Sequence, residues 1–171
     1  MSTALPGQLL CRLSEFVAAQ VGLHFPQERW RDLERGIGAA AREFGYADVS
    51  ACIQWLVSSA ATRSQLEVLA SHLTVGETYF FRERRSFEHL ETEVLPALIR
   101  SRRETEPHLR IWSAGCCTGE EAYSIAILLD RLIPDIAAWR IAILGTDLNS
   151  RFLQKARQGV YTQCRAPDVT Q

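Results

Sequence analysis

Two adjacent glutamates follow a glycine-bounded turn in the stretch IWSAGCCTGEEAYSIA, which spans residues 111–126. Gly115 and Gly119 bound the turn, and Glu120 and Glu121 come directly after it. Small residues let the backbone approach a ligand closely, and the start of a following helix offers unpaired N–H groups. An ordinary strand-to-helix connection has the same glycines, so the turn alone leaves both interpretations open.

The two carboxylates decide which ligand such a loop favours. A dinucleotide-binding loop usually reads G-x-G-x-x-G and keeps acids away from the pyrophosphate. Here the spacing is G-x-x-x-G, and Glu120 and Glu121 follow at once. They would repel a pyrophosphate but suit the ammonium and sulfonium groups of S-adenosylmethionine. The alternative is that they only complement the dipole of a helix in its first turn, an effect worth about 0.3–1 kcal/mol each.

A third acid stands at the end of the apolar segment RIAILGTD, residues 140–147. This segment has the pattern of a strand that is buried on both faces. In an open parallel sheet, ligands bind outside the carboxyl ends of the strands. Asp147 is therefore placed to accept hydrogen bonds from both ribose hydroxyls of an adenosine. Together with the paired glutamates, it favours S-adenosylmethionine over the dipole interpretation.

The elements that position these acids alternate between strands and helices. The patterns predict a strand at residues 109–113, a helix at 120–133, the strand at 140–147 and a helix ending at Gly159. Strand, helix, strand, helix implies a right-handed parallel unit and the opening of a doubly wound α/β domain. Before it, Pro96 starts a helical turn or kinks a continuing helix.

The first seventy or so residues predict helices and no strand. Pro26 suits the first turn of a second helix, and Asp48 can cap a third. Ser64 and Glu67 fit a capping box for a fourth helix. We therefore expect an all-helical N-terminal domain, followed by a linker and the α/β domain.

The composition allows this organisation and excludes several classes of function. The chain has 171 residues, of which 47% are apolar, so a packed core is feasible. We expect the helical domain at residues 1–76 and the linker with the α/β domain at residues 77–171. The net charge of −1 favours neither nucleic acid nor an anionic membrane as a partner.

The cysteines and the N-terminus suggest a cytoplasmic protein without a metal site. The five cysteines include no C-x-x-C pair, and the four histidines are scattered. An odd number of cysteines without framework spacing indicates reduced thiols in a cytosol. The N-terminus has no signal-peptide pattern, and no stretch of about 18 apolar residues predicts a membrane span.

Three motifs carry a family resemblance. They are T-x-F-F-R at residues 78–82, S-x-G-x-x-T-G-E-E-x-Y-S at 113–124 and A-R-x-G-x-Y at 156–161. In this order and after a helical leader, they resemble the CheR-type chemotaxis-receptor methyltransferases. The resemblance implies an all-helical N-terminal domain followed by a Rossmann-like, doubly wound domain that binds S-adenosylmethionine. It also implies that a glutamate on the cytoplasmic helices of a receptor is esterified, with S-adenosylhomocysteine as the by-product.

The resemblance assigns cofactor-contacting roles to particular positions. Matching residues of this chain are Gly76, Thr78, Arg82, Gly115, Glu121, Asp147 and Leu148. Gly76 stands where many members have an asparagine, and a glycine has no side chain to make that contact. Arg82 is the candidate catalytic residue, because it can hold the incoming carboxylate with charge-assisted hydrogen bonds. The alternative for Arg82 is a solvated surface arginine in the run RERR.

The expected chemistry needs little acid–base help. A glutamate carboxylate, with a pKa near ~4.3, is already ionised at neutral pH. Attack on the sulfonium methyl group is an in-line displacement, so orientation should dominate, and it can contribute on the order of 7–11 kcal/mol.

The predicted sheet is shorter than the family's. That family has seven strands, and only two are predicted before Gln171. We therefore expect the front portion of a methyltransferase. A non-catalytic module that docks on a receptor and at most binds cofactor is the alternative, and an NAD-type oxidoreductase is a weaker third. The second helix carries four arginines, which form either a receptor-docking face or a solvated one: Arg29, Arg31, Arg35 and Arg42.

Overall fold

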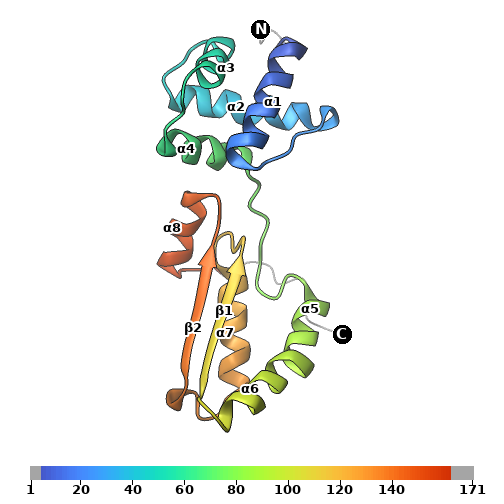
Figure 1. Ribbon diagram of the computed structural model, residues 1–171, viewed down its shortest axis with the longest axis vertical. Coiled ribbons are helices and arrows are strands. Elements are labelled where there is room, and N and C mark those ends of the chain that lie inside the picture. Colours follow the sequence, from blue (N-terminus) through green and yellow to red (C-terminus); the bar gives the residue numbers. More distant parts are fainter. Residues whose placement is uncertain (1–4, 163–171) are drawn as a thin grey trace. The chain divides into compact units, whose positions relative to one another are not determined.

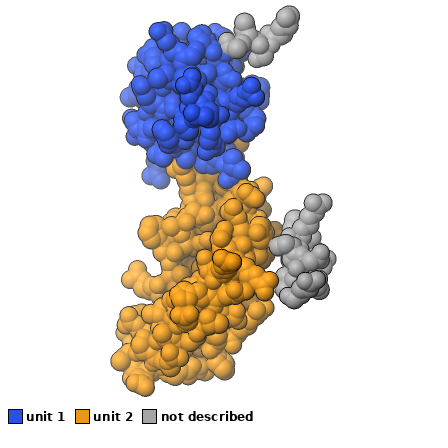
Figure 2. Space-filling view, turned by 90° about the vertical axis from the view of Figure 1, so that its right-hand side faces the viewer, with its two compact units in different colours: residues 1–75 blue, residues 76–171 orange. Residues whose placement is uncertain are grey.

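The protein divides into two compact units, residues 1–75 and residues 76–171 (Figure 2). The computed structural model describes residues 5–162. Cys164 and the stretch that follows it lie outside the described residues. Every residue that the sequence predicts to contact a cofactor belongs to the second unit.

Helices make up all the regular structure described in the first unit (Figure 1). They are α1 (Gly7–Val21), α2 (Trp30–Glu43), α3 (Val49–Ser58) and α4 (Arg63–Leu73), with a 3-10 turn at Gln27–Arg29. They enclose an apolar core whose fully buried members include Leu13, Val17, Leu33, Ile37, Ile53, Leu56 and Leu69. The amphipathic spacing of these residues along each helix accounts for the core.

The predicted helix starts fare differently. Asp48 caps α3 as predicted, because its side chain accepts the Ser50 N–H at 2.9 Å. Pro26 does not lie in the first turn of α2. It precedes the 3-10 turn at Gln27–Arg29, which leads into α2 at Trp30. Proline is tolerated directly before a helical turn, because a backbone N–H at that position would have no partner within the turn and proline has none.

The capping box of α4 lies two residues before the predicted one. Thr62 accepts the Gln65 N–H, and the Gln65 side chain accepts the Thr62 N–H. The prediction of Ser64 and Glu67 is wrong, because Glu67 pairs instead with Arg63 at 3.0 Å. Threonine with glutamine satisfies the same two backbone donors as serine with glutamate, so two overlapping pairs fitted the pattern.

The second unit begins with a linker segment (residues 76–83) and a helix that continues through Pro96. This helix comprises α5 (Arg84–His89), a π-helical turn (Leu90–Val94) and α6 (Leu95–Arg103). Of the two sequence alternatives, the continuing helix is therefore correct. A proline inside a helix lacks the N–H for the carbonyl four residues earlier and crowds it, and the wider π turn accommodates this.

Two parallel strands follow, β1 (His108–Ala114) and β2 (Arg140–Thr146). They pair in register, with Ser113 opposite Gly145. Helix α7 (Glu120–Leu132) and a 3-10 turn (Ile136–Ala138) connect them, and α8 (Ser150–Gln158) follows β2 and ends at Gly159. The predicted combination of helices with a small parallel sheet is confirmed. The parallel pairing places both strand ends, and the acids beyond them, at one edge of the sheet.

Only one face of this sheet is covered among the described residues. Leu109, Ile111, Ile141 and Ile143 face a core shared with helices α5 to α7. The alternate residues of both strands are exposed, with Trp112 at 68% and Leu144 at 61%. The prediction that residues 140–147 are buried on both faces is therefore wrong for this chain. Every described helix that packs on the sheet core does so on the same face.

Within residues 5–162, no helix combines the length and the apolar character needed to cross a bilayer.

Candidate functional site

The strand-end loop (residues 115–119) connects β1 to α7 through unusual backbone conformations. Gly115 and Gly119 have φ values of +79° and +102°, and Cys117 has φ +49°. The Thr146 carbonyl, at the end of β2, accepts the Gly115 N–H at 2.7 Å and the Cys116 N–H at 2.9 Å. Glycine reaches positive φ without steric cost, so both glycines are required by the shape of the turn.

Asp147 ties together the loops that follow the two strands. Its Oδ2 accepts the Cys117 N–H at 2.9 Å, and its Oδ1 accepts the Asn149 N–H at 2.8 Å. Asn149, which is 1% exposed, in turn caps α8 by accepting the Arg151 and Phe152 N–H groups. A carboxylate oxygen has two lone pairs, so each oxygen of Asp147 keeps one for a further donor.

The two glutamates point to different partners. Ser113 donates its hydroxyl to Glu121 Oε1 at 2.6 Å, and Ser113 is 1% exposed. The other oxygen of Glu121 has no hydrogen-bond partner among the described residues. Glu120 instead accepts the Thr118 hydroxyl at 2.6 Å and so folds back on the loop. Glu121 therefore keeps one carboxylate oxygen available to a ligand.

The linker segment is fixed beside the start of α7. The Phe81 N–H donates to Ser124 Oγ at 3.0 Å, and the Ser124 hydroxyl donates to the Glu120 carbonyl at 2.6 Å. Ser124 is fully buried, and Phe81 has φ +56°. This contact brings Thr78 and Arg82 next to the strand-end loop.

A cavity of about 90 Å³ lies where the linker segment meets the loop. Its lining residues are Glu77, Thr78, Tyr79, Arg82, Glu83, Phe87, Gly115, Cys117 and Glu121. The structure therefore brings together four of the predicted residues, from three separate segments. Pockets that enclose a whole ligand measure roughly 300–1,000 Å³, so this cavity can hold only one end of a cofactor.

The charges around the cavity favour a cation. Three carboxylates line it, those of Glu77, Glu83 and Glu121, against the single guanidinium of Arg82. A cavity lined mainly by one sign of charge concentrates ligands of the opposite sign. These carboxylate acceptors thus fit the ammonium and sulfonium end of S-adenosylmethionine, and they do not fit a pyrophosphate.

Arg82 stands at the exposed side of this cavity. Its Nη1 donates to the Glu77 carbonyl at 2.8 Å, and its Nη2 lies 3.7 Å from Glu77 Oε2. The side chain is 44% exposed. A guanidinium has five N–H donors, so donors remain for a second carboxylate after the contacts with Glu77.

Three of the predicted residues lie outside the cavity lining. A Cβ at Gly76 would lie 2.4 Å from Phe152 Cζ of α8, so packing requires this glycine. Leu148 is 46% exposed. Asp147 reaches the cavity only through Cys117, whose N–H it accepts and which does line it.

Both cysteines of the loop are buried and poorly suited to nucleophilic chemistry. Burial is the largest cause that raises the pKa of Cys116 and of Cys117, and the nearby carboxylate of Asp147 raises both further. A thiol with a raised pKa stays protonated at neutral pH, and the protonated form is a weak nucleophile. Among residues 5–162, no cluster of three or more His, Cys, Asp or Glu side chains could hold a metal ion.

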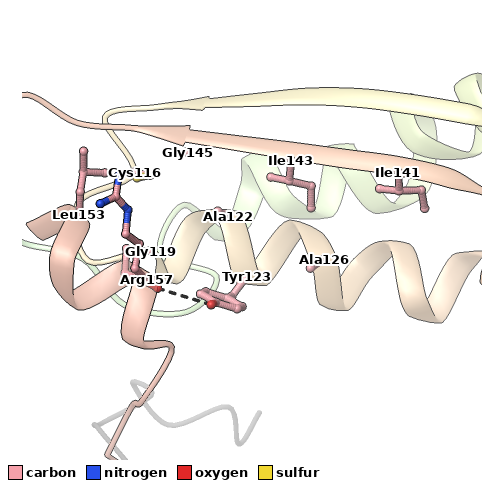
Figure 3. Close-up of a pocket in the computed structure, with 11 residues that line it drawn as sticks. Cys116, Gly119, Ala122, Tyr123, Ala126, Ile141, Ile143, Gly145, Leu153 and Arg157 are labelled. Carbon is pink, nitrogen blue, oxygen red and sulfur yellow. Dashed lines mark hydrogen bonds between the residues drawn. The ribbon is translucent and has the colours of Figure 1, made fainter.

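A larger hollow of about 480 Å³ lies between β2, α7 and α8 (Figure 3). Apolar and small side chains line most of it, including Ala122, Ala126, Ile141 and Ile143. It contains no carboxylate and none of the predicted site residues. The carboxylates that could accept an ammonium group therefore favour the smaller cavity as the cofactor site.

Three polar residues that position the site were missed from the sequence. Ser113 orients Glu121, Ser124 anchors the linker segment, and the Tyr161 hydroxyl donates to the Thr118 carbonyl at 2.7 Å. All three belong to the quoted motifs, and a polar residue at a motif position with no assigned ligand role was the available signal. Which partner each one contacts depends on the fold and could not be read from spacing.

The fold and the site together define a class of protein. A parallel β-α-β unit with acids beyond the carboxyl ends of its strands is the ligand-binding edge of nucleotide-cofactor proteins. The family profile described as "CheR methyltransferase, SAM binding domain" matches residues 76–171. The chain therefore belongs to the CheR methyltransferase family.

Curated relatives agree with this assignment. A probable chemotaxis protein methyltransferase of Rhizobium etli is 42% identical over 115 residues, which cover 67% of this chain and 42% of the relative. A chemotaxis protein methyltransferase of Borreliella burgdorferi is 30% identical over 158 residues, covering 91% of this chain and 56% of the relative. Chemotaxis protein methyltransferase 2 of Vibrio cholerae is 40% identical over 102 residues, which cover 60% of this chain and 35% of the relative. The chain thus spans about half the length of these relatives or less.

Proposed function

We propose that this chain binds S-adenosylmethionine, with the cationic methionine end in the 90 Å³ cavity, as part of an enzyme that methylates receptor glutamates. The main support is the aimed carboxylate of Glu121. One of its oxygens is held by a buried serine, and the other is available beside an acid-lined cavity. A carboxylate so placed pairs with an ammonium group without first having to reorganise.

Each predicted residue has a role in this proposal. Glu121 accepts the ammonium group, and Thr78 and the Gly115 backbone lie along the same cavity. Asp147, with the backbone of Leu148, faces the adenosine end with its remaining lone pairs. Gly76 contributes only its backbone, since its side-chain position is closed by Phe152.

Arg82 is proposed to hold the incoming carboxylate. S-adenosylmethionine supplies a methyl group on a positively charged sulfur, which a carboxylate oxygen attacks in line. The substrate glutamate is ionised at neutral pH, with a pKa near ~4.3, so no general base is required. The task left to the chain is orientation, and a guanidinium binds a carboxylate with a fixed geometry.

Titration calorimetry of the full chain with S-adenosylhomocysteine tests the cofactor site. The wild type should bind saturably, and Glu121→Gln should weaken binding by at least roughly tenfold, because it removes a charge-assisted contact. Glu120→Gln is the matched control, since Glu120 contacts Thr118 and does not line the cavity. Equal losses in both variants, or no binding by the wild type, would contradict the proposal.

A receptor-docking role for residues 1–76 is proposed with it, on acidic helices in the cytoplasm. Arg29 and Arg35 are already paired with Asp32, at 3.3 and 2.9 Å. Arg31 and Arg42 are exposed and have no ion pair within residues 5–162. Docking through this helix should therefore depend on the latter two. Reversing both charges should abolish co-sedimentation with a receptor fragment while leaving S-adenosylhomocysteine binding intact.

A non-catalytic docking module is the second candidate. It rests on Arg31 and Arg42 of α2, two exposed arginines that a docking role would use without any catalysis. Transfer of a radiolabelled methyl group to a receptor fragment separates the two candidates. Binding of S-adenosylhomocysteine without any transfer supports the module, and preferential saturable binding of NAD would support an oxidoreductase instead.

A further inference from the structure

We propose that Tyr161 is a positioning residue that sets the linker segment and the strand-end loop at their distance across the 90 Å³ cavity. This inference rests on the proposed function, since it concerns the same cavity. Tyr161 is not among the residues that line the cavity, and it is not one of the predicted cofactor contacts. It acts through the residues that it holds.

The first contact is with the strand-end loop. The Tyr161 hydroxyl donates to the Thr118 carbonyl at 2.7 Å, a short bond to the residue before Gly119. A Cβ at Gly119 would lie only 2.6 Å from the Tyr161 hydroxyl oxygen. The loop and the phenol thus fit closely, and the loop cannot shift toward Tyr161 without a clash.

The second contact is with the linker segment. The Phe80 ring meets the Tyr161 ring edge to face, with centroids 5.1 Å apart and an interplanar angle of 84°. Edge-to-face ring pairs are favourable and have a defined geometry. Phe80 lies between Thr78 and Arg82, which line one side of the cavity, whereas Gly115 and Cys117 line the other. Tyr161 therefore contacts both segments that form the cavity, through Phe80 of the linker segment and Thr118 of the strand-end loop.

The A-R-x-G-x-Y motif explains how Tyr161 reaches this position. Gly159 ends α8 with φ +61°, which turns the chain back toward the start of α7. A Cβ at Gly159 would lie 2.8 Å from the Tyr123 hydroxyl oxygen. Ala156 packs close to Gly119, since a Cβ built on Gly119 would lie 3.0 Å from the Cβ of Ala156. Three residues of the motif thus pack against the start of α7: Ala156, Gly159 and Tyr161.

The Tyr161 hydroxyl stays protonated and so remains a hydrogen-bond donor. Burial, with a smaller contribution from the Glu120 carboxylate, raises the pKa of Tyr161 to about 12. The phenol therefore keeps its proton, and the bond to Thr118, throughout the pH range in which methyl transfer would be assayed.

Tyr161→Phe removes this hydrogen bond and keeps the ring. Tyr123→Phe is the matched control, because the Tyr123 ring also meets Tyr161 edge to face and its hydroxyl also donates to a backbone carbonyl, that of Ala156 at 3.4 Å (Figure 3). Tyr123 lines the larger hollow and not the smaller cavity. Each variant thus removes one phenolic hydroxyl, but only the hydroxyl of Tyr161 is bonded to the strand-end loop.

Calorimetry of the full chain should show S-adenosylhomocysteine binding about fivefold to tenfold weaker in Tyr161→Phe, as expected for one hydrogen bond. Tyr123→Phe should stay within about twofold of the wild type. Each variant loses one hydrogen bond, so each should melt about a few degrees below the wild type. A merely structural role of Tyr161 would lower the melting temperature of Tyr161→Phe in this way but leave the affinity of its folded form unchanged.

Amide hydrogen exchange gives a second readout that needs no ligand. The Cys117 N–H, bonded to Asp147, and the Phe81 N–H, bonded to Ser124, report the two sides of the cavity. Both should exchange faster in Tyr161→Phe and not in Tyr123→Phe. Unchanged exchange overturns the inference, and so does faster exchange with unchanged affinity. If the wild type binds no S-adenosylhomocysteine, the proposed function fails while the exchange rates still decide whether Tyr161 holds the two sides.

Discussion

The Ser113 hydroxyl donates to Glu121 Oε1 across 2.6 Å and joins the end of β1 to the first turn of α7. The serine is 1% exposed, so this bond forms away from water. Bonds to an ionised acceptor are stronger than neutral ones. The carboxylate is thereby aimed before any ligand arrives, and binding need not meet the entropic cost of orienting it.

Ser113→Ala should therefore weaken S-adenosylhomocysteine binding. We expect a loss of about fivefold to tenfold, corresponding to about 1–1.4 kcal/mol for one hydrogen bond. Calorimetry measures the effect. Ser101→Ala serves for comparison, because the Ser101 hydroxyl donates only to the Leu98 carbonyl within α6. Wild-type affinity in Ser113→Ala would show that Glu121 needs no such support.

Asp147→Asn should destabilise the second unit even without ligand. An amide can accept one of the two N–H groups that Asp147 now accepts, but its NH₂ group faces the other. The expected loss in the free energy of unfolding is about 1–3 kcal/mol, measured by urea denaturation. Asp130→Asn removes an exposed carboxylate of α7 and should be neutral. A neutral Asp147→Asn would limit this residue to ligand contact.

Acid should weaken the contact between Arg103 and Asp135, which join at 2.9 and 2.8 Å. The hydrogen bond from Arg103 is the main cause that lowers the pKa of Asp135 from 3.8. A carboxylate whose pKa is lower in the folded state than in the unfolded state stabilises the protein at pH values above its unfolded-state pKa. This contribution is lost as the pH falls through the folded-state pKa. The pair is exposed, so the effect will be small.

The melting temperatures of the wild type and of Asp135→Asn test this contact. The wild type should melt higher at neutral pH, and the difference should shrink once the pH falls below about 3.8, the ordinary pKa of the carboxyl. A difference that is constant down to the lowest pH measured would assign the effect to packing rather than to charge.

The sequence predicted the elements better than the contacts. Periodicity and caps identify α7, α8, both strands and the cap at Asp48, because these signals are local. The capping box was misplaced because two overlapping pairs fit the same pattern. The exposed face of β2 was missed because its apolar run, with Leu144, matches a doubly covered strand, whereas the described helices cover one face.

The candidate site shows the same limit. Motif positions indicated Thr78, Arg82, Gly115 and Glu121, and the structure gathers all four around one cavity. The buried partner of Glu121 is eight residues away in the chain, and the partner of Thr118 is forty-three residues away. Contacts at such separations follow from how α7 and α8 pack, which no local pattern encodes.

Gly119→Ala should be strongly destabilising. With φ +102° the residue lies where an L side chain is strained, and its Cβ would meet the Tyr161 hydroxyl oxygen at 2.6 Å and Ala156 Cβ at 3.0 Å. Strain of this kind costs about 1–3 kcal/mol, and the clash adds to it.

Gly38→Ala is the control, and its effect on stability should have the opposite sign. Gly38 lies inside α2, and no atom lies within 4 Å of the new Cβ. This substitution should stabilise the chain by about 0.4–1 kcal/mol. Thermal unfolding followed by circular dichroism measures both changes. A Gly119→Ala variant as stable as the wild type would mean that the loop can leave this conformation, and the close fit of Tyr161 against it would then not be obligatory.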